Sequence, residues 1–554
     1  MPDEPPESDV SDAESISEDD FSGVPTFPGG TSDTHRRRLL QAMAGVASLG
    51  TVAMAGCLGD DEEEEPPENG DDDDDPPEDD DDDDDPPEDD DDDDDDDEPE
   101  PDRPDYTEID HMVPDWAPKE LVKDLDVQVA YNDDEIFFRF QWDWDVINGW
   151  FHDVFVYEDG EWVRYGEPNP GAADPDYGVG DIFSGFTEDR LSFLIDDGTV
   201  EGFEQFGGWM TIHEGTRTLP GAMEGDDVEG HPHHGDILGN DDVRKYIPQS
   251  REGEWWENDW DAVKDQDELD EMLENGEFLD MPMMRAHRGA PGGYATVHTI
   301  LDHRHGAMDE PSTRIRNSQD IVDGNPEYMF DPDVVEGGTL DLEEIYDGEV
   351  LQTETHALIQ GENMVEFDED EADVYEGAVI PRRYNRPDEV QGPGGLWQVD
   401  ATWEDGTWTL EMWRELESGY LGEQDFEDGE VYTWSPAVHG GGAQRWHWVG
   451  YPYKLGLGVE PEYFGEDAEF GNTEMVAENV EGEPDWGDVQ TYTLPMMYPG
   501  QTDWTWLTSG EHPRVDEVRN ADISIWEYHD AAMDDPESFA ARMIELEENN
   551  APRK

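Results

Sequence analysis

Two stretches of alternating apolar residues, each broken by an acidic turn, constrain the fold of this 554-residue chain more than any other feature. Residues 126–142 alternate around a turn at 132–134, and residues 396–414 alternate around a turn at 404–406. An apolar repeat of two is the pattern of a strand that buries one face, so each stretch predicts a β-hairpin. Further strands are expected at 190–195, 431–438 and 446–459.

Scattered strands, long loops and few helical periods indicate a mainly β fold, which we expect to be a β-sandwich. The sandwich domain is predicted to cover residues 104–480, with long loop insertions near 221–278 and 302–395. Residues 481–554 are expected to form a C-terminal extension that packs on this domain and ends in a short helix at 536–548.

The chain has a single cysteine, Cys57, and it lies at the end of an export signal. Disulfides, thiolate zinc sites, iron–sulfur clusters and covalently attached haem are therefore excluded for this polypeptide. Any redox centre that it carries must use His, Met, Lys or Tyr ligands.

Residues 34–40 read Thr-His-Arg-Arg-Arg-Leu-Leu and open an Ala/Gly-rich stretch that ends in Met-Ala-Gly-Cys at Cys57. This pattern resembles a twin-arginine signal followed by a lipoprotein cleavage box. Residues 39–56 fall short of the roughly 20 apolar residues of a membrane-spanning helix, so a transmembrane anchor is the weaker alternative. We expect residues 1–56 to be removed and the mature protein to be lipid-anchored through Cys57 at the outer face of the cell membrane.

Acidic residues number 150 against 30 Lys and Arg, which gives a formal charge of −120. Such self-repulsion destabilises a compact state in dilute buffer, but molar salt shortens the screening length to about 3 Å. The balance indicates an exported protein of an extreme halophile. It also excludes nucleic acid as a partner.

Residues 57–103 are predicted to be a disordered acidic linker. The unit Asp-Asp-Asp-Asp-Asp-Pro-Pro-Glu-Asp-Asp at 71–80 recurs at 81–90, and like charges interrupted by Pro-Pro can bury no core. We interpret it as a tether, in preference to a calcium-binding segment.

Residues 208–213 read Gly-Trp-Met-Thr-Ile-His. A c-type haem attachment motif reads Gly-Cys-x-x-Cys-His, so the glycine and the histidine keep their places and both cysteines are replaced. Haem bound here would be held without covalent bonds, as haem b.

The order of the motifs resembles the haem-binding subunits of type II molybdenum enzymes of the DMSO reductase superfamily. These include ethylbenzene dehydrogenase-like proteins and the related cytochrome c-552-like haem domains. The segments that carry the resemblance span about residues 110–460: 138–142, 189–191, 208–213, 280–288, 408–416 and 445–450.

The resemblance implies one axial haem ligand from the attachment segment and one from a late strand. His213 matches the first place, with Met210 close by, while His447 matches the second place and Lys454 follows seven residues later. Because neutral imidazole suits iron, we expect the pair His213 and His447. Met283 and Met284 stand where relatives carry tryptophans around the haem edge. The alternative that either histidine is only a hydrogen-bonded polar residue at a strand end stays open.

The resemblance further implies an electron-transfer subunit that performs no chemistry of its own. Its expected partners are a molybdenum catalytic subunit and an iron–sulfur subunit, with electrons exchanged with a membrane cytochrome or a soluble carrier. For a halophile that respires anaerobically we expect an outward-facing nitrate reductase, ahead of a DMSO, selenate or chlorate-type reductase.

A different class, a carbohydrate-binding or solute-binding lipoprotein, would use Trp397, Trp403, Trp408 and Trp413 as stacking platforms. Alternation across two paired strands places several of these rings in the core instead, which disfavours that class.

Two histidine-rich segments, 231–234 and 298–305, contain ligand types that bind metals. They lie in acidic, Gly-rich contexts without a His-Glu-x-x-His helix, so a metal site is not the favoured interpretation.

An apolar surface patch that faces the iron–sulfur subunit is predicted around the attachment segment, since exposed apolar area marks interfaces. The alternative is that the same residues line the haem pocket. The set is Trp209, Met210, Ile212, Met281, Met283 and Met284.

Overall fold

The computed structural model describes the strand-rich part of the chain. The described residues are 122–144, 154–165, 188–211, 228–240, 243, 245–253, 260–306, 317–346, 356–387, 390, 392–439, 447–459, 474–497, 519–520 and 525. Within these residues no helix is both long and apolar enough to cross a membrane. The predicted signal, the acidic linker and the helix at 536–548 lie outside the described residues.

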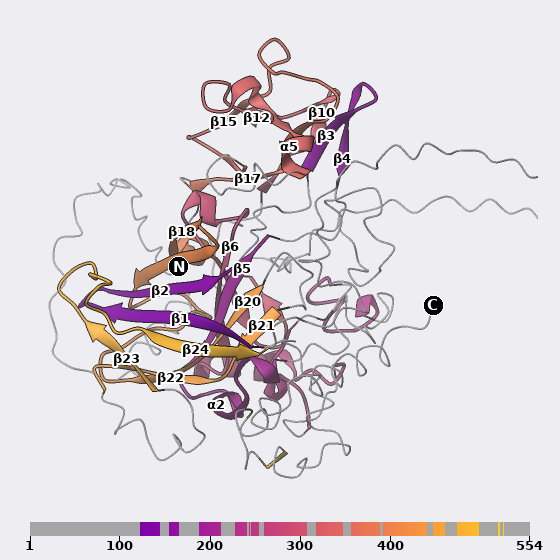
Figure 1. The fold of residues 1–554 in the computed structure, drawn as a ribbon. Helices are drawn as coiled ribbons and strands as arrows, with labels where there is room; N and C mark the ends of the chain where they lie inside the picture. Colours follow the sequence, from indigo (N-terminus) through magenta and orange to yellow (C-terminus); the bar gives the residue numbers. More distant parts are fainter. Residues whose placement is uncertain are drawn as a thin grey trace, which may run out of the picture. The chain divides into compact units, whose positions relative to one another are not determined.

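A 13-stranded sheet dominates the fold (Figure 1). Its strands are β1 (Val122–Tyr131), β2 (Glu135–Asp143), β5 (Arg190–Asp196), β6 (Leu279–Arg285), β7 (Thr296–Ile300), β8 (Arg304–His305), β18 (Gln398–Glu404), β19 (Thr407–Glu415), β20 (Val431–His439), β21 (His447–Gly450), β22 (Tyr453–Leu457), β23 (Glu474–Asn479) and β24 (Tyr492–Met497). The main path runs β18-β19-β2-β1-β23-β22-β20-β5-β6-β7-β8, and β24 pairs with both β1 and β21. The predicted mainly β class is confirmed.

Both predicted hairpins form. β1 and β2 pair antiparallel with Asp126 opposite Gln141, and β18 and β19 pair antiparallel with Gln398 opposite Trp413. The turn between β18 and β19 places Asp405 at a φ of +51°, a region that Asp tolerates better than most residues. Alternation along β19 buries Trp408 and every second residue after it, as the period of two requires.

The large sheet curls until its two ends meet. β2 and β5 are five positions apart in the strand order, which in a flat sheet separates them by about 24 Å. The rings of Phe138 on β2 and Phe193 on β5 are nevertheless 5.2 Å apart. At the far ends, Ala295 N donates to Trp397 O at 3.1 Å beside β7. One sheet therefore supplies both layers around a single core.

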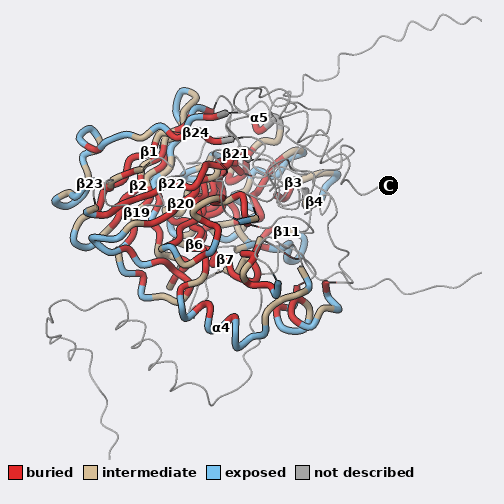
Figure 2. The backbone as a smooth tube through the Cα atoms, turned by 90° about the horizontal axis from the view of Figure 1, so that it is seen from below, coloured by how far each residue is buried: buried red, intermediate tan, exposed pale blue. Residues whose placement is uncertain are grey.

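The concave inner face of the curled sheet carries an aromatic core. Trp434 of β20 packs against Phe138, Phe140 and Phe193 with ring centroids 6.1 to 6.3 Å apart. Figure 2 shows buried residues concentrated along these long strands. Because opposite residues of paired strands share a face, Ile195 and Asp280 of β5 and β6 also belong to the inner face.

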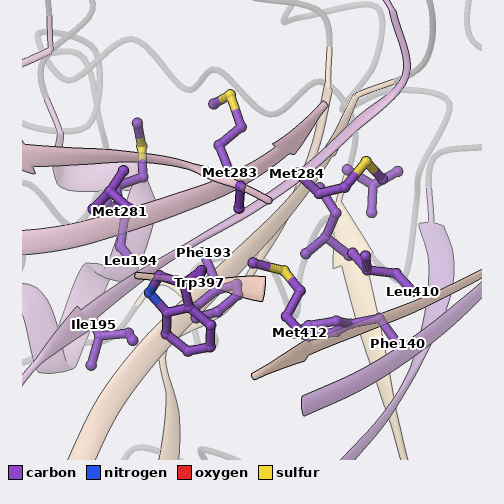
Figure 3. Close-up of a cluster of buried hydrophobic side chains, with 14 of the residues drawn as sticks. Phe140, Phe193, Leu194, Ile195, Met281, Met283, Met284, Trp397, Leu410 and Met412 are labelled. Carbon is purple, nitrogen blue, oxygen red and sulfur yellow. The ribbon is translucent and has the colours of Figure 1, made fainter. Parts of the chain in front are cut away.

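The opposite, outer face of β20, β5 and β6 is also covered by other parts of the chain. Ser435 of β20 lies opposite Leu194 of β5, and Ser192 of β5 lies opposite Met283 of β6. Ser435 and Met283 are both buried. Figure 3 shows Met281 and Met283 extending from β6 in one direction. This face, and not the aromatic core, receives the segment that carries the degenerate attachment motif.

Smaller sheets occupy much of the segment expected as the second insertion. Their strands are β3 (Val154–Glu158), β4 (Glu161–Tyr165), β9 (Asn317–Ser318), β10 (Ile321–Val322), β11 (Asn325–Pro326), β12 (Tyr328–Phe330), β13 (Leu340–Asp341), β14 (Leu358–Ile359), β15 (Met364–Glu366), β16 (Ala378–Pro381) and β17 (Arg383–Asn385). In the largest of them, β3 pairs with β4 and β16, so a strand from before the motif joins the insertion.

The described helices are short. They are α2 (Phe203–Phe206), α4 (Gln266–Asn275) and α5 (Leu342–Tyr346), with 3₁₀ turns that include η2 (Gly207–Met210) and η4 (Ala290–Gly292). α4 lies in the first expected insertion. It is capped at Asp265, whose side chain accepts from Glu268 N while Glu268 bonds back to Asp265 N, and it ends at Gly276 in the left-handed region.

Candidate functional site

The segment with the degenerate motif docks closely on the outer face of β20. α2 and η2 follow each other directly, and Gly208 N donates to Ser435 Oγ at 3.0 Å. Gly207 has a φ of +54°, and a Cβ there would meet Pro452 N and Ser435 Oγ at 3.0 Å. A Cβ on Gly208 would lie 3.3 Å from Val449 of β21. The glycine pair thus allows an approach that a side chain would obstruct.

Lys454, the alternative to His447 as the late-strand ligand, lies on β22 with a side chain that is 10% exposed. Its Nζ donates to Thr433 Oγ1 at 3.0 Å and lies 2.6 Å from Glu204 Oε1. Because Glu204 belongs to α2, this ion pair ties the motif-bearing segment to β22. The structure therefore brings Lys454 and the Met210 segment to the same region of the fold.

His447, the other late-strand candidate, begins β21 at the end of a row of positions that crosses four strands. The register pairs His447 with His439 of β20, and His439 with Arg190 of β5. The row continues from Arg190 to Arg285 of β6. Met283, two residues before Arg285, accepts a hydrogen bond from Arg285 Nε to its Sδ at 3.4 Å.

The predicted exposed apolar patch is wrong for every member that the structure describes. Trp209, Met210, Met281, Met283 and Met284 are all buried. The reason is that η2 packs onto the sheet and β6 is a central strand covered on both faces. The alternative, that these residues line the haem pocket, stays a prediction, and Met284 lies opposite Leu191 on the inner face. Ile212, His213 and Cys57 lie outside the described residues.

A family model described as ethylbenzene dehydrogenase matches residues 101–450. The chain belongs to the ethylbenzene dehydrogenase family. Membership confirms the predicted resemblance and places the chain among subunits related to molybdenum enzymes of the DMSO reductase superfamily. The matched segment contains the motif and His447, while Lys454 lies four residues beyond its end. No curated protein matches the chain.

Residue types that can ligate a haem iron lie close to the docked motif. A Met thioether, a His imidazole and a Lys or Tyr group are the ligand types left to a chain whose only cysteine is Cys57. Met210 is fully buried on η2, and the backbones of His447 and Lys454 lie on neighbouring strands that contact the same segment. The residues present therefore suit non-covalent haem.

A buried group of arginines beside these positions escaped prediction from the sequence. Glu188 Oε1 accepts from Arg190 Nε at 2.9 Å and from Arg288 Nη2 at 3.0 Å. Each of these side chains is at most 5% exposed. The sequence carries one indication of this group. Only 30 Lys and Arg occur against 150 acidic residues, so arginines within apolar strands are unusual.

The two histidine-rich segments meet at one buried carboxylate. Asp302 Oδ2 lies 2.6 Å from His233 Nε2, and Asp302 Oδ1 lies 2.7 Å from His305 Nε2. Burial raises the pKa of Asp302, but His305 and His233 outweigh burial and hold that pKa well below its usual range. No group of three or more potential ligands placed to hold a metal ion occurs within the described ranges.

Of the four tryptophans that the carbohydrate-binding alternative would use, two are fully buried and two are half-buried. Trp397 and Trp408 are fully buried in the aromatic core. Trp403 and Trp413 are half-buried, and Trp403 Nε1 donates to Trp144 O at 2.8 Å. Two of the four rings are thus unavailable for stacking on a sugar.

Proposed function

We propose that this family member is a b-type haem electron-transfer subunit of a molybdenum oxidoreductase complex. The observation that carries the proposal is the docking of η2 on β20, with Gly208 N bonded to Ser435 Oγ. It puts the degenerate attachment motif next to the strands β21 and β22 that hold both late-strand candidates. When bound, haem b supplies one-electron transfer.

The axial ligands are proposed to be His213 from the motif and His447 from β21, with Met210 and Lys454 as the competing pair. Ligation requires a lone pair on nitrogen, and the Lys454 amine lies 2.6 Å from the Glu204 carboxylate. This contact and the hydrogen bond to Thr433 Oγ1 already engage Lys454 Nζ, which favours His447. Met210 remains the nearest described sulfur donor on the motif side.

The partners that we propose are a molybdenum catalytic subunit and an iron–sulfur subunit. Membership of the ethylbenzene dehydrogenase family supports the first of these. Nitrate reductase is the proposed complex, with DMSO, selenate or chlorate-type reductases as alternatives. Affinity isolation of the native protein in molar salt tests this: co-purification of both subunits supports it, and repeated recovery of the chain alone contradicts it.

The decisive experiment on the cofactor is reconstitution of the full chain with haem b in molar salt. We expect a low-spin six-coordinate absorption spectrum, and complete removal of the haem by acidified organic solvent because Cys57 provides no thioether pair. The absence of a Soret band that saturates at one haem per chain would reject the proposal.

Single substitutions distinguish the proposed ligand pair, His213 and His447, from the competing pair, Met210 and Lys454. His213→Ala and His447→Ala should each give a high-spin spectrum, whereas Lys454→Ala and Met210→Leu should leave the low-spin form largely intact. A loss of the low-spin form in Lys454→Ala alone would transfer the ligand role to Lys454.

We also propose export and lipidation at Cys57. Cys57→Ala should release the protein from membranes, because a lipid and not residues 39–56 would be the anchor. A Cys57→Ala variant that still sediments with membranes in salt-washed fractions contradicts the lipid anchor.

A further inference from the structure

One hydroxyl, that of Ser435 on β20, joins three separate parts of the chain. It accepts a hydrogen bond from Gly208 N at 3.0 Å and donates one to Gly450 O at 3.0 Å. Gly208 lies in residues 203–210, which form α2 and η2 and which we call the motif segment, and Gly450 is the last residue of β21. Because a serine hydroxyl has one hydrogen and that hydrogen goes to Gly450 O, a lone pair receives the Gly208 N–H. Both bonds together fix the orientation of the buried hydroxyl.

Glycines allow the neighbouring backbones to approach β20 closely at this hydroxyl. A Cβ on Gly208 would lie 3.2 Å from Ser435 Oγ, and a Cβ on Gly207 would lie 3.0 Å from the same oxygen. On the side of β21, a Cβ on Gly450 would meet Pro436 Cγ at 2.6 Å. The motif segment and β21 are therefore both held at backbone distance from β20, and Ser435 is the side chain that hydrogen-bonds to both.

A second hydroxyl on the same face of β20 holds the motif segment in a different way. Thr433 Oγ1 accepts from Lys454 Nζ at 3.0 Å, and that nitrogen lies 2.6 Å from Glu204 Oε1 of α2. This link runs through two long side chains, whose rotatable bonds tolerate changes of distance. Ser435 bonds directly to the backbone of both its partners and tolerates far less change. The link through Thr433 can secure the segment, whereas only the link through Ser435 can set its spacing.

The two backbone groups that Ser435 joins lie close in sequence to the proposed haem ligands. Gly208 is five residues before His213, and Gly450 is three residues after His447. A six-coordinate haem takes one axial ligand on each side of its iron. The separation of the motif segment from β21 therefore bears on whether both ligands can reach the iron.

We propose that Ser435 is a positioning residue of the haem site, which sets the separation between the motif segment and β21. It acts through the backbone of Gly208 and Gly450 and is not itself a ligand. Functional groups must be held within about 0.5 Å of their working geometry, and a supporting hydrogen bond on a rigid strand meets that need. This inference rests on the proposed haem function.

The test measures the spin state of haem b bound by the full chain in molar salt. Ser435→Ala removes both hydrogen bonds with little change in volume. We expect the ratio of low-spin to high-spin haem to fall about fivefold or more, the factor that corresponds to one lost buried hydrogen bond. Thr433→Val is the matched control, because it removes a hydroxyl from the same face two residues away and leaves the bonds of Ser435 in place. It should keep the wild-type ratio.

A second variant breaks the same contact from the other partner. Gly208→Ala would place a Cβ 3.2 Å from Ser435 Oγ and 3.3 Å from Val449 Cγ1, so the motif segment must move away from β20. The same fall in the low-spin ratio is expected. The double variant should be no worse than the larger single change, because both substitutions remove one contact. Chemical denaturation without haem shows which variants fold.

The outcomes separate the two proposals. A wild-type chain that gives no low-spin haem overturns the haem function and the positioning role with it. A low-spin wild type whose ratio is unchanged in Ser435→Ala and Gly208→Ala overturns the positioning role alone. Additive losses in the double variant, or an equal loss in Thr433→Val, also overturn it, since the effect would then not belong to this one bond. Failure of both Ser435→Ala and Gly208→Ala to fold does the same, because Ser435 would then serve the fold and not the haem.

Discussion

Strand β6 contributes one residue to each of two buried polar clusters, one on the inner face of the sheet and one on the outer face. On the inner face, Asp280 lies among the groups around Arg414, and Gln424 N donates to Asp280 Oδ2 at 3.2 Å. Glu423 is the second buried carboxyl of this inner cluster. On the outer face, Arg285 of the same strand lies with Arg190 and Arg288 around Glu188. Arg414 is the cation that acts on both buried carboxyls of the inner cluster, whereas Arg190, Arg285 and Arg288 all act on Glu188.

The difference teaches that, between equally buried carboxyls, the neighbouring charged groups decide whether the pKa rises or falls. Burial raises the pKa of Asp280 to about 6, although Arg414 opposes the shift. Burial and the neighbouring Asp280 raise the pKa of Glu423 well above its usual range. Glu188 is also fully buried, yet its pKa is lowered because Arg288, Arg190 and Arg285 lie close to it. The inner carboxyls therefore hold their protons to a higher pH than usual, whereas Glu188 stays ionised to a lower pH.

Arg414→Leu should have the largest effect on stability, because it leaves Asp280 and Glu423 buried without their cation. The guanidinium lies 5.1 Å from the Trp397 ring centroid and is 1% exposed. We expect a loss of about 3–5 kcal/mol in the free energy of unfolding, measured by chemical denaturation in molar salt. Arg139→Leu, which breaks a half-exposed ion pair, is the control and should cost about 1 kcal/mol or less. Equal losses in the two variants would contradict the assigned role of Arg414.

The pH dependence of stability should differ in sign between the two clusters. A carboxyl whose folded pKa is raised stabilises the protein below its unfolded pKa, and this contribution is lost as the pH rises through the folded value. For Asp280 the window runs from about 4 to about 6, and the shift corresponds to about 3 kcal/mol. Asp280→Asn should therefore flatten the decline of stability across this window.

Glu188→Gln tests the opposite sign. Because the folded pKa of Glu188 is lowered, its stabilisation is present above the unfolded pKa and is lost as the pH falls. The variant should be less sensitive to acid than the wild type, below about pH 5. Parallel pH profiles for Asp280→Asn and Glu188→Gln would remove the distinction between the clusters.

The hairpins and the fold class could be predicted because they depend on a local repeat. The alternation around 132–134 and 404–406 is visible in the sequence. In the structure the apolar residues of each strand are buried in the same alternation, as along β19. The curl of the sheet could not be predicted, since it arises from contacts such as Phe138 with Phe193, which are 55 residues apart. α4 was not predicted because it buries only Leu269, Met272 and Leu273 and so has a weak apolar repeat, although its capping box and terminal glycine are present in the sequence.

The candidate site was predictable in its residue types and not in its arrangement. The degenerate motif identified Met210 and the glycine pair, but the burial of Met281, Met283 and Met284 depends on β6 lying between β5 and β7. The arginines around Glu188 could not be foreseen for a related reason. Glu188 and Arg288 are 100 residues apart, and only the β5–β6 register brings them together.

Gly207→Ala should have an intermediate effect that is specific to the outer face. The φ of +54° and the 3.0 Å approach to Pro452 N both oppose a side chain. We expect a loss of about 1–3 kcal/mol together with weaker haem binding, since η2 would lift from β20. Gly406→Ala, in the β18–β19 turn, has a φ of +86° and open space around its Cβ. It is the control for strain alone, so it should leave haem binding unchanged.

The smallest expected effect compares neighbouring methionines on the two faces of β6. Met283→Leu and Met284→Leu conserve volume, so each should cost less than about 1.5 kcal/mol in unfolding free energy. Leucine cannot accept the hydrogen bond that Arg285 Nε donates to Met283 Sδ at 3.4 Å, whereas Met284 lies opposite Leu191 on the inner face. Haem affinity, followed at the Soret band, should fall about two- to fivefold for Met283→Leu and stay constant for Met284→Leu. A larger loss for Met284→Leu would mean that the cofactor depends on the aromatic core, and the separation of the two faces would fail.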